Sequence, residues 1–275
     1  DMHGLPTENA VQKKLKLKTK EEIIEKGMDK FVKECMNFSL THAKFMNDDL
    51  KRFGIWMDFD NAYMPIKKEF ISGQWAFFKK ADEQKRLYKG TKVMHWDSQT
   101  ETSLAKHELE YKTVKDTSIF LKFRKKGTKN EYFIIWTTTP WTIPFNLAIM
   151  VNPDVDYVKM EVKTDNGKEH WTVAGVLAGI FMNSVMGEKF KVIEECKGEK
   201  LEGQEYEHFL EEELVGKYQE LKKQYPKVHS IILSKQYVDT TSGTGLVHCA
   251  PGCGPEDEEV ARGYGIGGYN SLNEQ

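Results

Sequence analysis

The sequence predicts an α+β protein, in which a helical segment of residues 1–90 precedes a β-barrel-like domain of residues 91–275. Two observations support this division. Apolar residues recur at helical spacing up to Gly90, as in Phe31, Cys35 and Phe38, and Thr19 with Glu22 forms a capping-box signature. Beyond Gly90 the apolar residues fall into short alternating runs, which are typical of strands.

The β-rich part contains several separate strand and turn signals. Ile119, Leu121 and Phe123 alternate with polar residues, and residues 157–161 alternate in the same way. Residues 165–167 read Asp-Asn-Gly, a strong hairpin turn. We expect further strands at 190–193 and 231–233, and helices at 176–186 and 209–225, packed outside a barrel-like core.

Composition limits the functional classes. A hydrophobic fraction of 39% predicts a folded domain, and a net charge of −2 gives no overall signal for nucleic acid. Local basic runs at residues 122–126 and 13–20 are candidate RNA contacts, with a solvated surface as the ordinary alternative.

The four cysteines are too scattered for a disulfide framework, and no apolar run is long enough to span a membrane. We therefore expect a cytoplasmic protein without a membrane partner. His248, Cys249 and Cys253 lack a fourth ligand at suitable spacing, so no metal site is predicted.

Residues 136–146 place a row of hydroxyls, Thr137, Thr138 and Thr139, between two tryptophans. The preceding residues 132–135 read as a buried strand. Because prolines at 140 and 144 disfavour a helix, we expect a rigid, extended loop at the end of that strand.

A second motif lies about a hundred residues later. Residues 243–252 read Gly-Thr-Gly-Leu-Val-His-Cys-Ala-Pro-Gly, and Glu256 and Asp257 follow. Glycines give the backbone freedom to approach a ligand closely, and Gly245 is our candidate for such an approach.

Together the two motifs resemble the editing insertion of class I isoleucyl-tRNA synthetases. The Thr-Thr-Thr-Pro-Trp-Thr and Gly-Thr-Gly-x-Val-His-x-Ala-Pro strings mark that family and occur here in the same order. Leucyl and valyl relatives usually have Arg-Pro-Glu-Thr at the first motif. Residues 1–8, 58–63 and 104–111 extend the resemblance over nearly the whole chain.

The family's His-Ile-Gly-His and Lys-Met-Ser-Lys-Ser signatures, which handle ATP, do not occur in this sequence. The resemblance thus implies a piece of a larger synthetase, with the remainder of that enzyme as a partner. The parent enzyme uses ATP and Mg, whereas we expect no cofactor for this part and no amino-acid activation.

The resemblance implies hydrolysis of the ester of mischarged Val-tRNA(Ile), and leaves open hydrolysis of valyl adenylate. A single pocket rejects a side chain that is one methylene smaller only weakly, so a second, smaller site removes the error. The partners implied are the acceptor end of tRNA(Ile) and the valyl ester itself.

Asp257 suits the substrate ammonium, because an ionised carboxylate makes a charge-assisted hydrogen bond with it. It stands nine positions after His248, the spacing of the family's essential aspartate. The alternative is a carboxylate that caps the start of a helix.

Thr138 and Thr139 are the other predicted catalytic residues, and with Thr137 they would bind the adenosine end and position water. Thr137 has the alternative of packing a strand edge.

The resemblance assigns supporting roles to four more residues. Trp141 would form a wall of the site, or else be an ordinary core tryptophan. Thr142 and Asn146 would be supporting contacts, Thr142 near the size filter. His248 would be a wall that excludes isoleucine, in preference to a general base. Water would attack directly, without a covalent intermediate or a metal.

Two other functions remain open at this stage. In the first, the chain is a binding module for the aminoacylated tRNA 3′ end with little turnover, and it uses the same pocket. In a third interpretation it is a structural segment whose threonines and glycines only shape loops.

Overall fold

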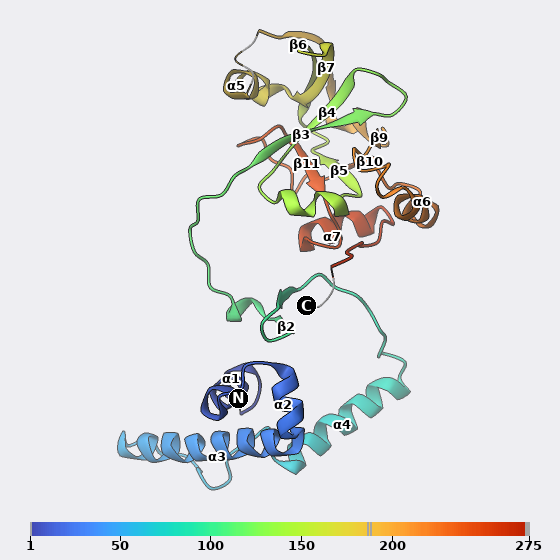
Figure 1. The fold of residues 1–275 in the computed structure, drawn as a ribbon. Coiled ribbons are helices and arrows are strands. Elements are labelled where there is room, and N and C mark those ends of the chain that lie inside the picture. Colours follow the sequence, from blue (N-terminus) through green and yellow to red (C-terminus); the bar gives the residue numbers. More distant parts are fainter. Residues whose placement is uncertain (1, 186, 188, 273–275) are drawn as a thin grey trace. The chain divides into compact units, whose positions relative to one another are not determined.

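The computed structural model describes residues 2–185, 187 and 189–272 and divides the chain into two compact units (Figure 1). Within the described residues, the first unit extends to Thr91 and includes Trp96–Thr102, and the second comprises Lys92–His95 and residues 103–272.

The first unit is helical. Thr19 caps its second helix, because its Oγ1 accepts a hydrogen bond from the Glu22 N–H at 3.3 Å. Val11, Ile23 and Phe31, one from each of the first three helices, form its small buried core. The helices are α1 (Leu5–Leu15), α2 (Lys20–Lys26), α3 (Met28–Arg52) and α4 (Lys68–Glu83).

The second unit is built on a curled, half-barrel sheet of nine strands (Figure 1). The strands run in the order β10-β5-β11-β4-β7-β6-β8, with β3 paired to β4 and β9 paired to β3. Their bounds are β3 (Ile119–Lys125), β4 (Glu131–Thr137), β5 (Ala148–Val151), β6 (Asp156–Thr164), β7 (Gly167–Ala174), β8 (Lys191–Lys197), β9 (Tyr206–Glu207), β10 (Ser230–Leu233) and β11 (Leu246–Cys249). A separate two-stranded sheet contains β1 (His95–Asp97) and β2 (Thr102–Leu104).

Strand β4 is central to this sheet because it pairs on both sides. β3 runs antiparallel along one side, from Ile119 opposite Thr137 to Arg124 opposite Tyr132. On the other side β7 pairs with its first half and β11 with its second half, both parallel to it. The two segments that follow β4 and β11 therefore leave the sheet at the same edge.

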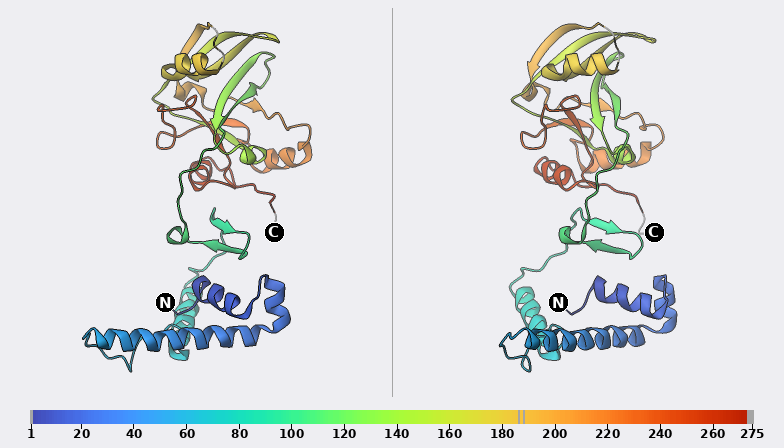
Figure 2. Two further views of the ribbon diagram at one scale, coloured as in Figure 1. Left: turned by 60° about the vertical axis from the view of Figure 1, so that its left-hand side comes forward. Right: turned by 90° about the vertical axis from the view of Figure 1, so that its left-hand side faces the viewer.

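Three helices complete the second unit. α5 (Gly175–Val185) packs against β6 and β7 and covers the end of the sheet that these strands form (Figures 1 and 2). α6 (Val215–Gln224) and α7 (Pro255–Gly263) share a second core cluster with β5 and β10. Short 3₁₀ helices η1 (Lys106–Glu108), η2 (Pro140–Phe145) and η3 (Gly198–Leu201) connect these elements.

The α+β prediction is confirmed, as are the strands around residues 119–123, 157–161 and 231–233 and the hairpin at 165–167. The strand predicted at 190–193 continues further, as β8. The helix predicted at 176–186 begins at Gly175, and residue 186 lies outside the described part of the chain.

The helix predicted over residues 209–225 is wrong in its first part. Residues 209–214 form turns, and α6 begins at Val215. The Leu210 N–H donates to His208 Nδ1 at 3.1 Å, so a side chain takes a backbone donor at the start of the expected helix.

Candidate functional site

The two sequence motifs meet at one edge of the sheet. Val247 of β11 pairs with Trp136 of β4, so the residues that follow the two strands emerge side by side. The Thr142 Oγ1 and His248 Nε2 atoms lie 2.8 Å apart and join the motifs by a hydrogen bond. Residues far apart in the chain therefore form one constellation.

The segment after β4 is more tightly folded than predicted. Instead of an extended loop, Pro140–Phe145 forms η2. Pro140 stands at the first turn of η2, where the missing N–H costs nothing, and Thr142 N–H donates to the Thr139 carbonyl at 3.1 Å. The expectation that prolines would prevent a helix here is wrong, because proline is compatible with the first turn of a helix.

The three threonines of this segment face different surroundings. Thr137 is buried, and its Oγ1 accepts a hydrogen bond from the Thr139 N–H at 3.1 Å. Thr138 and Thr139 are exposed, so their hydroxyls are accessible to a ligand. Thr142 Oγ1 donates to the Thr139 carbonyl at 2.8 Å, which ties the segment together. Trp141 is 61% exposed, which excludes the core-tryptophan alternative.

His248 and Asn146 lie behind this surface. Asn146 is fully buried, and its Nδ2 donates to the Ala148 carbonyl and to His248 Nδ1, both at 2.9 Å. A carbonyl oxygen only accepts, so the contact with Ala148 fixes which end of the amide carries the hydrogens. His248 Nδ1 therefore accepts, and Nε2 carries the proton that it donates to Thr142.

This arrangement determines what His248 can do. Burial, with a smaller contribution from His208, lowers the pKa of His248 to about 4, so the ring is neutral at pH 7. Both ring nitrogens are engaged in hydrogen bonds. The imidazole is thus a neutral donor, a geometry that suits a wall better than a general base.

Asp257 lies in the first turn of α7, whose N-cap is Gly254. Its Oδ2 accepts a hydrogen bond from the Ala250 N–H at 2.9 Å, which anchors the carboxylate one residue past the end of β11. The pKa of Asp257 is raised to about 6, mainly by burial; the hydrogen bond from the Ala250 N–H opposes the rise, and the charge of Glu256 adds to it. The carboxylate thus contacts the backbone before the helix instead of capping the helix, and its desolvation gives it a strong preference for a cationic partner.

Gly245 has a structural reason for being glycine. Its φ is +74°, and a Cβ there would lie 2.4 Å from the Cβ of Ala174. The Gly245 carbonyl accepts a hydrogen bond from the Tyr157 hydroxyl at 2.7 Å. The close approach at this position is therefore to β7, within the protein.

Further aromatic and histidine residues, which the sequence interpretation missed, lie behind the site. The fully buried Tyr206 donates its hydroxyl hydrogen to Asn146 Oδ1. His208 and His229 stack with ring centroids 5.4 Å apart, and His229 packs edge-on against Tyr218. Tyr206 and His208 alternate with glutamates in the sequence, which was a weak strand signal in a strand of two residues.

The basic run at residues 122–126 is largely neutralised by carboxylates. Its side chains pair across the sheet with glutamates, which supports the solvated-surface interpretation over RNA contact. The pairs are Lys122–Glu169, Arg124–Glu207, Lys125–Glu131 and Lys126–Glu205.

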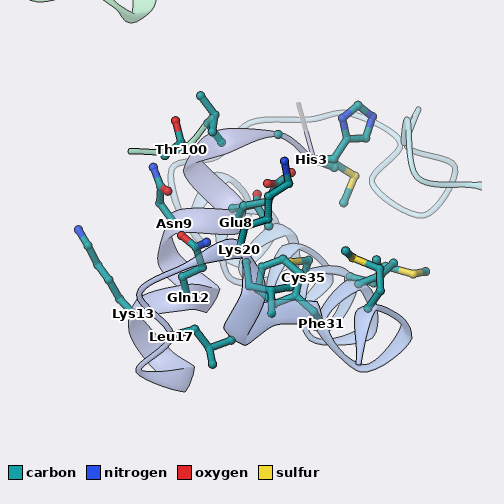
Figure 3. A pocket seen from close by; sticks show the side chains of 18 of the residues that line it. His3, Glu8, Asn9, Gln12, Lys13, Leu17, Lys20, Phe31, Cys35 and Thr100 are labelled. Atoms are coloured by element: carbon teal, nitrogen blue, oxygen red, sulfur yellow. The ribbon is translucent and has the colours of Figure 1, made fainter. Parts of the chain in front are cut away.

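A cavity of about 960 Å³ lies in the first unit, whereas the site residues above belong to the second. Figure 3 shows Glu8, Asn9 and Gln12 along one side of it and Phe31 and Cys35 along another. Within the described residues, no three His, Cys, Asp or Glu side chains are grouped to hold a metal ion. The same part of the chain contains no helix that is long and apolar enough to cross a membrane.

The sequence of the chain is similar to those of known proteins. Residues 1–241 match the family model described as tRNA synthetases class I (I, L, M and V), and the chain belongs to this family.

Curated relatives include isoleucine–tRNA ligases. That of Pyrococcus abyssi is 47% identical and that of Methanocaldococcus jannaschii 40% identical over the whole of this chain. The chain spans about a quarter of their length, 26% and 27% respectively. A solved leucyl-tRNA synthetase editing domain of P. knowlesi is 12% identical, with a TM-score of 0.40 over 56% of this chain and 66% of that one.

Proposed function

We propose that the second unit hydrolyses the ester bond of mischarged Val-tRNA(Ile), as an editing domain of an isoleucyl-tRNA synthetase. The observation that carries the proposal is the Thr142–His248 hydrogen bond at 2.8 Å, which joins the threonine motif to the histidine motif. The identity with isoleucine–tRNA ligases over the whole chain supports the choice of amino acid.

Each group of the site has a part in this proposal. The Asp257 carboxylate holds the substrate ammonium and so fixes the ester carbonyl. The exposed Thr138 and Thr139 bind the terminal ribose and position a water molecule, with Thr137 behind them and Trp141 as an exposed platform beside them. His248 forms the wall that limits the size of the side chain, and Thr142 and the buried Asn146 support it by hydrogen bonds to its two ring nitrogens.

Specificity follows from the rigidity of that wall. A neutral imidazole fixed at both nitrogens cannot rotate away without breaking two hydrogen bonds. The additional methylene of an isoleucyl ester would then meet a fixed surface, while a valyl ester fits.

Deacylation measurements test the proposal. The chain is incubated with Val-tRNA(Ile) and with Ile-tRNA(Ile), and free amino acid is measured over time. We expect the valyl ester to be cleaved faster, and an Asp257→Ala variant to lose about 10²-fold or more in kcat/KM. A variant as active as the unmodified chain would remove Asp257 from the mechanism.

The same samples separate editing from simple binding. Saturable affinity for the valyl ester with hydrolysis at the Asp257→Ala level would favour the binding module. If the residues merely shape loops, calorimetry with a non-hydrolysable valyl-adenosine mimic would show no binding, and the deacylation assay would show no turnover. Localisation in the cytoplasm and the tRNA acceptor end as a partner belong to the same proposal.

A further inference from the structure

A chain of hydrogen bonds connects the buried core to the exposed threonines. Tyr206 donates to Asn146, Asn146 donates to His248, His248 donates to Thr142 and Thr142 donates to the Thr139 carbonyl. Each donor in the chain is directed the same way, from the core outward. The first residue of this chain, Tyr206, lies in β9 and is fully buried.

We propose that Tyr206 is a positioning residue that holds Asn146 in one orientation and thereby fixes His248 in the tautomer with its proton on Nε2. The inference rests on the proposed function only for what it says about substrate. The orientation of the Asn146 amide and the tautomer of His248 can both be tested in the protein without substrate.

The amide of Asn146 is fully buried. Both of its N–H groups are used, one by Ala148 and one by His248, and its oxygen is met by the Tyr206 hydroxyl. Turning the amide over would place Oδ1 against the Ala148 carbonyl oxygen, which is repulsive. The Ala148 carbonyl and the Tyr206 hydroxyl therefore set the orientation of the amide from its two ends, and without the hydroxyl only one of these two contacts remains.

Tyr206 is suited to this role because it remains protonated. Burial raises the pKa of Tyr206 well above its ordinary value, so the phenol is protonated and can donate at neutral pH. Its ring is held by Phe123 at 5.0 Å between centroids and by His229 at 5.4 Å. The hydroxyl is thus aimed by packing as well as by its hydrogen bond.

Removing this hydroxyl leaves a buried acceptor without its donor. The Asn146 amide then gains by turning toward other groups, and His248 Nδ1 loses its fixed donor. With that donor gone, the imidazole populates both neutral tautomers, and in the second of these Nε2 accepts instead of donating. The Thr142 hydroxyl and the His248 wall of the site then adopt more than one hydrogen-bonded arrangement.

The test is the tautomer of His248, read from its ¹⁵N chemical shifts in the 275-residue chain with ¹⁵N-labelled histidine. Signals are assigned by comparison with a His248→Gln variant. We expect the Nε2–H pattern in the unmodified protein and a shift toward a mixture in Tyr206→Phe. Tyr157→Phe is the matched control, since Tyr157 is also fully buried and its hydroxyl bonds Gly245 and Asn152 instead.

Three results would overturn the proposal. They are an Nδ1–H pattern in the unmodified protein, an unchanged pattern in folded Tyr206→Phe, and an equal change in Tyr157→Phe. The first needs no variant, so the proposal is decided even if Tyr206→Phe fails to fold. None of these readings uses substrate, so they stand whether or not the chain hydrolyses an ester.

A second measurement addresses the consequence for specificity. In Tyr206→Phe we expect the ratio of kcat/KM for valyl over isoleucyl tRNA to fall about tenfold, with Tyr157→Phe unchanged in that ratio. A shifted tautomer with an unchanged ratio would overturn the link to selectivity. Absence of hydrolysis in the unmodified chain would instead count against the proposed function.

Discussion

At the scale of single residues, Asp257 is a desolvated carboxylate to which we assign the binding of the substrate ammonium. Of four consecutive acidic residues, Glu256 to Glu259, Asp257 is the one that bonds the backbone at the end of β11, whereas Glu258 bonds the Val93 N–H at 3.0 Å. A desolvated carboxylate with a raised pKa is typical of a functional group. Its titration therefore gives a direct signature of its role.

We expect deacylation by the free protein to depend on an ionised Asp257. Below pH 6 the carboxyl is protonated and cannot hold the ammonium by a charge-assisted bond, so kcat/KM should rise with pH and level off above a midpoint of about 6. The profile is measured between pH 5 and 8. Asp257→Asn supplies the control, because any rise that remains in it comes from hydroxide; the same midpoint in both proteins would contradict the assignment.

His248 gives the second prediction at this scale. His248→Ala removes the imidazole from the proposed wall and enlarges the pocket by more than one methylene. We expect the preference for valyl over isoleucyl tRNA to fall by about 10-fold to 200-fold, the range that one methylene contributes. Retained selectivity in the folded variant would show that another surface sets the size limit.

At the scale of elements, the start of β11 depends on a glycine. Gly245→Ala forces φ = +74° on a residue with a side chain and brings its Cβ to 2.4 Å from Ala174. We expect a loss of about 2–4 kcal/mol in the free energy of unfolding, measured with urea. Gly179→Ala in α5 is the control, because the space around it is open and alanine favours helix by up to about 1 kcal/mol. Equal stability of the two variants would contradict the packing argument.

Local pattern was sufficient to predict most single elements. The alternation in β3 and β6 and the turn between β6 and β7 depend on neighbouring residues, which a sequence shows directly. The family resemblance also located both motifs, because each motif is an uninterrupted run of residues in the sequence. What it could not show is the parallel pairing of β11 with β4, a contact between distant segments.

The failures have local physical causes. Residues 209–214 turn because the ring of His208 bonds the Leu210 N–H, and residues 140–145 coil because Pro140 occupies a first-turn position. Tyr206 was missed because its role depends on Asn146, sixty positions away, and on a strand of two residues. Non-local hydrogen bonds of this kind leave no periodic trace in a sequence.

At the scale of the whole molecule, three buried histidines connect the stability of the second unit to pH. Burial lowers the pKa of His208 to about 4, of His229 to about 3 and of His248 to about 4, and the unfolded chain has ordinary values near 6.5. Among the described residues, both ring nitrogens of His229 lack a hydrogen-bond partner of good geometry, and the Asn146 backbone offsets only part of the effect of burial on its pKa.

The sign follows from proton binding. Below pH 6.5 the unfolded state binds protons on these histidines and the folded state does not, so their contribution to stability is complete above pH 6.5 and is lost as pH falls toward 4. Asp257 acts in the opposite sense between about pH 4 and 6, because its pKa is raised in the fold. Three histidines against one carboxyl leave a difference of up to two protons, or up to about 2.7 kcal/mol per pH unit near pH 5.

Urea unfolding at pH 7.5, 6 and 5, followed by the amide signals of β5 and β11, measures this dependence. His229→Phe keeps a ring against His208 and Tyr218 but removes one titrating group. Its slope near pH 5 should therefore be lower by about 1.4 kcal/mol per pH unit, the value for one proton. A wild-type stability that does not change between pH 7.5 and 5 would mean that these rings are solvated or charged in the fold, and the neutral His248 on which the proposed wall depends would fail with them.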